Sequence, residues 1–123
     1  MKLDAGELEQ AAWIALQIPI DYTRKRRNLA WAAMAGAKNL ELHRHYPLHD
    51  VIDPVHQTRF YYHAHPIDGG EREHGHFHIF LDVAPGRFHH LVSLALDPQG
   101  RPTRWFCTNR WVTGESWASA DDL

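Results

Sequence analysis

Two neighbouring segments decide the fold: TRFYYHAH at residues 58–65 and EHGHFHIFLDV at residues 73–83. Residues of different character alternate along each, as expected of a β-strand, whose successive side chains point to opposite faces of a sheet. Five of the eleven histidines in this 123-residue chain fall here, most of them at a spacing of two. These histidines are His63, His65, His74, His76 and His78. The spacing predicts one histidine row on each of two paired strands.

Two further strands are predicted at residues 88–96 and 103–113, because breaks that contain Gly and Pro separate them from each other and from residues 73–83. Short links between consecutive strands predict an antiparallel meander. Residues 43–57 contain two prolines and two aspartates, so we expect a structured connection there rather than a regular element.

Two helices are predicted before the strands. The first covers residues 4–18, with Asp4 as N-cap, Glu7 at the capping-box position and Pro19 as the stop. The second covers about residues 24–42, where small and apolar residues recur at helical spacing. The expected fold class is therefore α+β, a four-stranded antiparallel meander sheet with two N-terminal helices packed on one face.

The expected organisation is a single domain. A helical N-terminal layer would occupy residues 1–42, a His-rich antiparallel β module residues 43–117, and a short tail residues 118–123. At this length, with 44% apolar residues, the chain can bury a core.

Strand alternation assigns the side chains to faces. In the second segment the odd positions from Phe77 to Leu81 are apolar, so we expect the odd face to be the core face and the histidines to lie opposite. A hairpin that pairs His65 with His74 or His76 puts both histidine rows on the same face. A shift of one residue in register would reverse the assignment for a whole strand.

The next hairpin is expected to pair Val83 with Phe88. The residues that this register places on the core face are Val92, Leu94 and Leu96. The residues that it places on the histidine face are His89, Leu91, Ser93 and Ala95. Ser93 and Ala95 are small, so their place beside the imidazoles would leave room for the floor of a pocket.

Histidine rows on paired strands point to a transition-metal site. Same-face positions on one strand are about 6.7 Å apart, and imidazole nitrogens bind zinc at about 2.0–2.1 Å, so neighbouring imidazoles can lean toward one ion. All-nitrogen sites suit Zn, Cu, Fe and Ni rather than Mg or Ca. The predicted metal ligands are His63, His65, His76 and His78. Asp50 and Asp53 are candidates to orient these ligands.

Four other residues are candidate catalytic groups: His74, Tyr61, Arg110 and Glu115. His74 lies nearest the loop and could act as a base, and Tyr61 shares a row with His63. A strand over residues 103–113 would place Arg110 on the histidine face, where it could clamp a carboxylate or phosphate or simply pair with an acidic side chain. Glu115 is a candidate general base. Trp111 and Trp117 could wall a pocket or close the core.

The leading functional hypothesis is a metal-dependent enzyme, either hydrolytic or redox, that acts on a small molecule at a mononuclear multi-histidine site containing Fe, Cu or Zn. One alternative is a non-catalytic protein that binds a metal ion or a small ligand. Another is a homo-oligomeric pH sensor whose histidines charge together.

A third alternative follows from HGHFHIF at residues 74–80. This run resembles the signature of the histidine-triad nucleotide hydrolases and transferases. The resemblance implies attack on phosphorus by the central residue, here His76. Gly75 departs from the apolar residue that is usual at its position.

Composition limits the other possibilities. The formal charge is −2, which gives no electrostatic argument for nucleic acid. Cys107 is the only cysteine, so no internal disulfide can form. The start of the chain lacks the apolar run of a signal peptide, and no apolar stretch is long enough to span a membrane. We therefore expect a soluble cytoplasmic protein.

Several motifs together resemble a family of small bacterial proteins that is known only as a domain of unknown function. The resemblance covers about residues 43–117 and implies that they form one module, with no activity attached. The motifs that carry it are HYP at 45–47 with Asp50 and Asp53, YYHAH at 61–65, EHGHFH at 73–78 and TNRWVTGE at 108–115.

Overall fold

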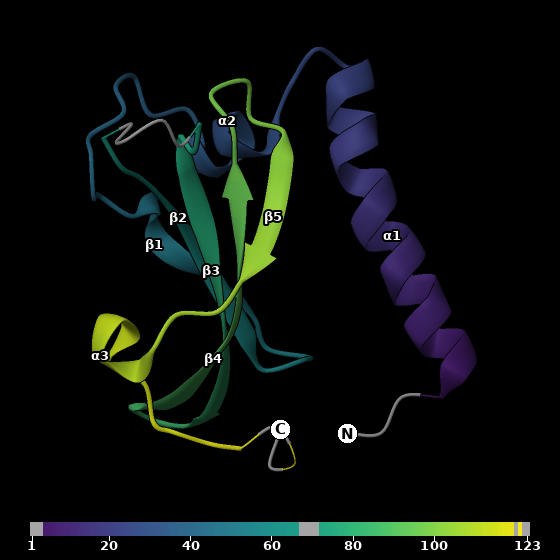
Figure 1. Cartoon of the computed structure of the whole chain (residues 1–123), viewed down its shortest axis with the longest axis vertical. Helices are drawn as coiled ribbons and strands as arrows, with labels where there is room; N and C mark the ends of the chain where they lie inside the picture. Colours follow the sequence, from purple (N-terminus) through teal and green to yellow (C-terminus); the bar gives the residue numbers. More distant parts are fainter. Residues whose placement is uncertain (1–3, 67–71, 120, 122–123) are drawn as a thin grey trace.

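The computed structural model describes residues 4–66, 72–119 and 121, apart from the side chain of Arg110. The elements are α1 (Ala5–Arg24), α2 (Leu29–Met34), β1 (Tyr46–Asp53), β2 (Thr58–Ala64), β3 (Gly75–Ala84), β4 (Arg87–Leu96), β5 (Pro102–Phe106) and α3 (Arg110–Thr113). The strands form one sheet in the order β1-β2-β3-β4-β5, with every neighbouring pair antiparallel (Figure 1). The predicted α+β class and antiparallel meander are confirmed.

The sheet has five strands, so the prediction of four is wrong. The additional strand is β1, which lies inside the predicted connection over residues 43–57 and pairs Tyr46 with Tyr62. Pro47 is compatible with β1 because this is the edge strand of the sheet, where a missing N–H need not break the ladder. The register is irregular between Tyr46 and Val51, which blurs the alternation that would reveal the strand.

The last predicted strand, residues 103–113, is also corrected. β5 ends at Phe106, and α3 begins at Arg110. The side chain of Asn109 caps this turn by accepting hydrogen bonds from the N–H groups of Trp111 at 3.0 Å and Val112 at 3.3 Å. Arg110 therefore does not lie on a strand.

The prediction of two N-terminal helices of similar length is wrong as well, because α1 is the one long helix among the described residues. It begins at the predicted capping box of Asp4 and Glu7 and continues past Pro19 to Arg24. The predicted second helix shrinks to α2, six residues that start at the N-cap Asn28. It stops because Ala35 and Gly36 adopt left-handed backbone angles, with φ of 48° and 82°.

Only α2 packs closely on the sheet. Its Ala30 and Ala33 are buried against Tyr62, Leu94 and a few neighbours at one end of the sheet. Small side chains let this short helix approach the strands closely. No residue of α1 is buried, and Figure 1 shows α1 beside the sheet. The predicted layer of two packed helices is therefore absent from the described chain.

The predicted pairing of the histidine strands is confirmed. His63 lies opposite His76, and the backbone N–H of His65 donates to the carbonyl of His74 at 3.1 Å. Both histidine rows consequently share one face. Across the next ladder, Ala95 and Ser93 lie opposite His76 and His78, as expected for small residues beside the imidazoles.

The β3–β4 hairpin departs from the predicted register. Phe88 pairs with Asp82 rather than Val83, and the register shifts again between Ile79 and Phe80. The second shift passes over Leu91, so His90 rather than His89 or Leu91 lies beside the histidines. A β-bulge of this kind adds a residue to one strand and reverses the alternation beyond it.

The histidine face is itself buried. His76 and His78 are 7% and 2% exposed, and Phe80 on the same row is 2% exposed. Buried Leu94 lies on the opposite face, which is the predicted core face. The expectation that only the odd face is a core face is therefore wrong, because both sides of the central strands are buried near the histidines. Among the described residues, no helix combines the length and apolarity that a membrane span requires.

Candidate metal centre

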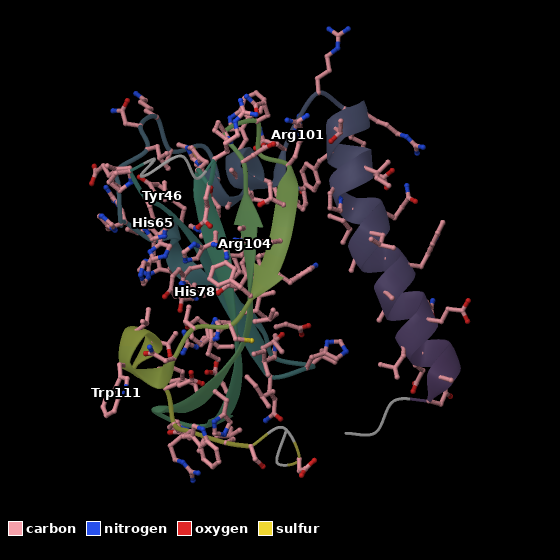
Figure 2. All side chains as sticks on the ribbon, in the orientation of Figure 1. Tyr46, His65, His78, Arg101, Arg104 and Trp111 are labelled. Carbon is pink, nitrogen blue, oxygen red and sulfur yellow. The ribbon has the colours of Figure 1, made fainter. Side chains whose placement is uncertain are left out.

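Three imidazoles converge from β2 and β3. The Nε2 atom of His76 lies 3.0 Å from Nε2 of His63 and 2.9 Å from Nε2 of His78. Each of the three residues offers one ring nitrogen, and these nitrogens all lie within 4.8 Å of one another. Two ligand atoms at roughly 90–110° on bonds of about 2.1 Å lie about 3.0–3.4 Å apart, close to the distances observed. Figure 2 shows ring nitrogens gathered around the labelled His65 and His78.

Hydrogen bonds alone cannot account for both close nitrogen–nitrogen contacts of His76. His76 Nδ1 lies 2.5 Å from the carboxylate oxygen Oε1 of Glu73, so this nitrogen donates to Glu73. Nε2 of His76 then has one lone pair or one N–H, and either can serve only one of the two facing nitrogens. A metal ion, in contrast, accepts all three nitrogens at once. The donor set therefore fits a transition-metal ion that prefers imidazole.

The other ring nitrogens of the two buried histidines are also held. Glu73, which orients His76, accepts from the guanidinium of Arg104 at 3.1 Å. Nδ1 of His78 lies 2.9 Å from the hydroxyl of Ser93 and 3.0 Å from Nε2 of His90. Metal-bound imidazoles typically give their second N–H to such partners, which fix the ring orientation and the tautomer.

Burial keeps four imidazoles at and beside the site neutral: those of His63, His78, His65 and His90. It lowers the pKa of His63 and of His78 to about 3, and the positive charge that His76 would carry lowers both further. Burial also lowers the pKa of His65 and of His90. Because a metal ion binds the deprotonated nitrogen, these groups are in their ligand form at neutral pH.

His65, the fourth predicted ligand, lies beside the other three but is aligned differently. Nε2 of His65 lies 3.2 Å from Nδ1 and 3.5 Å from Nε2 of His76. It therefore faces the edge of the His76 ring that lies between these two nitrogens, and it does not face one nitrogen alone. It forms a second candidate group with Glu73 and His76. All four predicted ligands are thus brought together, and three of them, His63, His76 and His78, each bring one ring nitrogen within 4.8 Å of the other two.

The motifs of this site lie within a recognised family. The chain belongs to the family described as domain of unknown function (DUF6969). The sequence model of that family matches residues 9–123, in agreement with the resemblance that the motifs indicate. No curated protein and no solved structure matches the chain.

In this DUF6969 chain, His74 lies away from the other histidines. Its Nδ1 is 2.7 Å from the hydroxyl of Tyr62, a residue that packs on α2. β3 begins at Gly75, so strand alternation does not extend back to His74. The expected row of three histidines, and with it a histidine triad centred on His76, is therefore not formed. His74 also has no contact with the converging nitrogens that would suit the predicted base.

Tyr61 lies where the sequence predicts. Its ring is 5.7 Å from the ring of His63 and 5.3 Å from that of His78, and it stacks on His45 at 3.7 Å between centroids. Burial, together with the charge of Asp50, raises the pKa of Tyr61. The phenol is consequently protonated at neutral pH, and its ring forms part of the wall beside His63 and His78.

Glu115 reaches the site through His90. One carboxylate oxygen accepts the backbone N–H of His90, and the other accepts the hydroxyl of Thr113 at 3.0 Å. A groove of about 570 Å³ opens beside them. It is lined by His90, Thr108, Asn109, Trp111, Glu115, Trp117 and Ala118, so the two tryptophans do form pocket walls. Arg110 opens α3 nearby, but its predicted clamp lies outside the described side chains.

Sequence reasoning missed two residues that hold the ligands, Glu73 and His90. Glu73 stands in the EHGHFH motif but precedes β3, where strand alternation gives no guidance. His90 is brought to the site by the bulge in β4. The carboxylates predicted to orient the ligands, Asp50 and Asp53, instead bind Arg59 at 2.7 Å and His56 at 2.6 Å.

Proposed function

We propose that this chain is a metal-dependent enzyme with a mononuclear transition-metal centre held by His63, His76 and His78. The observation that carries the proposal is the convergence of their Nε2 atoms, at 3.0 and 2.9 Å from that of His76, while Glu73 holds the outer nitrogen of His76. Three protein ligands leave at least one coordination position for water or substrate.

The chemistry of such a centre follows from its ligands. Neutral imidazoles without thiolates suit Fe, Cu, Zn or Ni, and a bound ion would supply Lewis acidity or redox chemistry at the open position. The chain's own residues would orient the ligands and limit access of water. Phe106 packs edge-on against His76 with 5.0 Å between ring centroids, and Tyr61 packs on the other side near His78.

The substrate class is a small polar molecule, and the groove beside His90 is its proposed entry. Thr108 lines this groove, and its hydroxyl oxygen is buried beneath the groove surface with no hydrogen-bond partner in the described part of the chain. Leaving such a group unsatisfied costs about 1–3 kcal/mol, so a ligand that bonds to it would recover that energy. His90 connects the groove to His78 across 3.0 Å.

The test has a binding step and an open-site step. Metal-free protein is titrated separately with Zn²⁺, Fe²⁺, Cu²⁺, Ni²⁺ and Co²⁺, and bound metal is measured by elemental analysis. We expect one equivalent in the wild type and loss of tight binding in His76→Ala. The matched control is His56→Ala, because His56 is an exposed histidine that contacts Asp53. Failure of every ion to bind tightly would refute the proposal.

The open position is tested with azide on the Co²⁺-loaded protein. We expect azide to change the visible spectrum, because it can occupy a position that the protein leaves free. A spectrum that azide does not alter would argue against the enzyme and for a closed site.

The closed site is the second candidate function: a protein that binds a metal ion without turnover. The observation that favours it is His65, whose Nε2 lies 3.5 Å from Nε2 of His76. A rotation of this side chain would supply a fourth imidazole. Four nitrogens around one ion would leave no position for substrate in a tetrahedral site.

A further inference from the structure

α1 presents an apolar face that none of the described residues covers. Leu8, Ile14 and Ile18 are 54%, 50% and 44% exposed, and no residue of this 20-residue helix is buried. Helical geometry puts Ile14 and Ile18 on one side of α1 with Leu8 at its edge, while Trp13, Leu16 and Ile20, which are 67%, 64% and 45% exposed, form a second apolar group on the opposite side. Most helical stability in proteins comes from packing an apolar face rather than from helix propensity, so an uncovered face of this kind favours a packing partner.

The sheet has a matching uncovered surface. α2 covers only one end of the sheet face opposite the histidines, the end that contains Tyr62 and Leu94. Farther along the same face, Phe60, Ile79 and Val92 lie side by side in register and are only half-buried. Trp105, which pairs with Leu94 from the edge strand β5, is 58% exposed. Among residues 4–66, 72–119 and 121, both an apolar helix face and an apolar sheet face are therefore left without a partner.

The accessible surface of the chain is too large for a compact monomer. It measures 9040 Å² for 14.3 kDa, about 2,200 Å² more than the roughly 6,800 Å² expected from the scaling of surface with mass. A standard interface buries about 800 Å² per partner, and obligate dimers bury more. The excess is thus large enough for an extensive dimer interface.

The link after α1 holds the helix away from its own sheet. The N–H groups of Arg26 and Arg27 donate to the carbonyls of Thr23 and Tyr22 at 3.0 and 2.8 Å, and Asn28 already caps α2. A link this short and this well bonded opposes folding α1 back, and short hinges favour exchange of an element between copies. The family match begins at residue 9, so it includes most of α1.

We infer that the partner is a second copy of this chain. In the dimer, α1 of each copy packs its apolar face on the sheet face formed by Phe60, Ile79, Val92 and Trp105 of the other copy. The exchange is reciprocal, as a two-fold axis requires, and it satisfies both uncovered faces at once. The inference rests on apolar surface alone and does not depend on the metal centre.

Sedimentation velocity and light scattering of the full chain test the dimer over a wide range of protein concentration. We expect twice the 14.3 kDa chain mass for the wild type. Ile18→Glu on the helix face and Trp105→Glu on the sheet face should each shift the protein toward monomer. Trp13→Glu is the control for the second apolar group, on the opposite side of α1, and should stay dimeric. Circular dichroism verifies that each variant is folded.

Each outcome decides the inference. A monomeric wild type at all concentrations overturns it, whatever the variants do. Dissociation by Ile18→Glu but not by Trp105→Glu would mean that two α1 helices pair with each other, which overturns the exchange. Dissociation by Trp13→Glu as readily as by Ile18→Glu would show that the wrong face of α1 was assigned. Dissociation by both Ile18→Glu and Trp105→Glu, with the control dimeric, supports exchange.

Discussion

Glu73 and His76 form a short hydrogen bond, with 2.5 Å between Oε1 and Nδ1. This contact fixes which nitrogen of His76 faces the other two imidazoles, because the nitrogen that donates to a carboxylate cannot bind a metal ion. It also links the site to β5, since Glu73 accepts from Arg104. One carboxylate just outside β3 thus holds the central ligand of the proposed centre.

The first prediction concerns that carboxylate. Glu73→Gln keeps an acceptor oxygen but removes the negative charge that orients His76. We expect metal affinity to fall about 10–100-fold, the usual effect of losing a partner that supports a ligand. The measurement is competition with a zinc chelator of known affinity.

Glu115→Gln provides the control for this experiment. Glu115 is also partly buried, but it accepts from a backbone N–H rather than from a ligand ring. Its replacement should leave metal affinity nearly unchanged. Equal affinities for Glu73→Gln and the wild type would contradict the proposed role of Glu73.

The second prediction concerns Gly75, the first residue of β3, which stands between His74 and the ligand His76. A Cβ at this position would lie 2.3 Å from the carbonyl oxygen of His63 and 2.8 Å from Cα of Ala64. Backbone atoms cannot move aside cheaply, so Gly75→Ala should lower the free energy of unfolding by about 1–3 kcal/mol, the usual cost of overpacking. Urea denaturation of the metal-free protein measures the change.

Gly86→Ala separates crowding from backbone strain. Gly86 has a positive φ of 71°, but nothing lies within 4 Å of the added Cβ. Its cost should be limited to that of a left-handed residue, about 1–2 kcal/mol. If metal affinity falls in Gly75→Ala but not in Gly86→Ala, close approach at Gly75 also positions the ligands. A Gly75→Ala protein as stable as the wild type would contradict the crowding.

The sequence predicts the central part of the site because local alternation and a short hairpin determine it. The pairing of His63 with His76 follows from the alternation of both segments, and the small residues on β4 follow from the next hairpin. His90 could not be assigned, because a bulge at Leu91 leaves no mark in the hydrophobic pattern. β1 was missed for a related reason: an edge strand with Pro47 and an irregular register has no clean period.

The third prediction is that the metal-free protein loses stability in acid. The pKa values of His63 and His78 are about 3 in the folded chain, against about 6.5 when unfolded. Below the unfolded pKa, the unfolded chain binds more protons, so the free energy of unfolding falls as the pH decreases. The stability is fully present above about pH 6.5 and is progressively lost between about pH 6.5 and pH 3.

Urea unfolding in the presence of a chelator, in steps across this window, measures the loss. A His63→Gln, His78→Gln double variant should show a shallower dependence on pH, because it lacks the two groups that must remain neutral. His49→Gln, at an exposed position on β1, should keep the wild-type dependence. The pKa assignment is wrong if the double variant and the wild type lose stability in parallel.

The last prediction separates the aligned ligands from His65. His63→Ala removes a nitrogen 3.0 Å from Nε2 of His76, whereas His65→Ala removes one that lies along the edge of the ring. If three imidazoles form the centre, His63→Ala should lower the affinity for Co²⁺ much more than His65→Ala does. The Co²⁺ spectrum of His65→Ala should then match that of the wild type, and azide should still alter it. Equal losses of affinity in the two variants, with a wild-type spectrum that azide leaves unchanged, would instead establish His65 as a fourth ligand in a closed site.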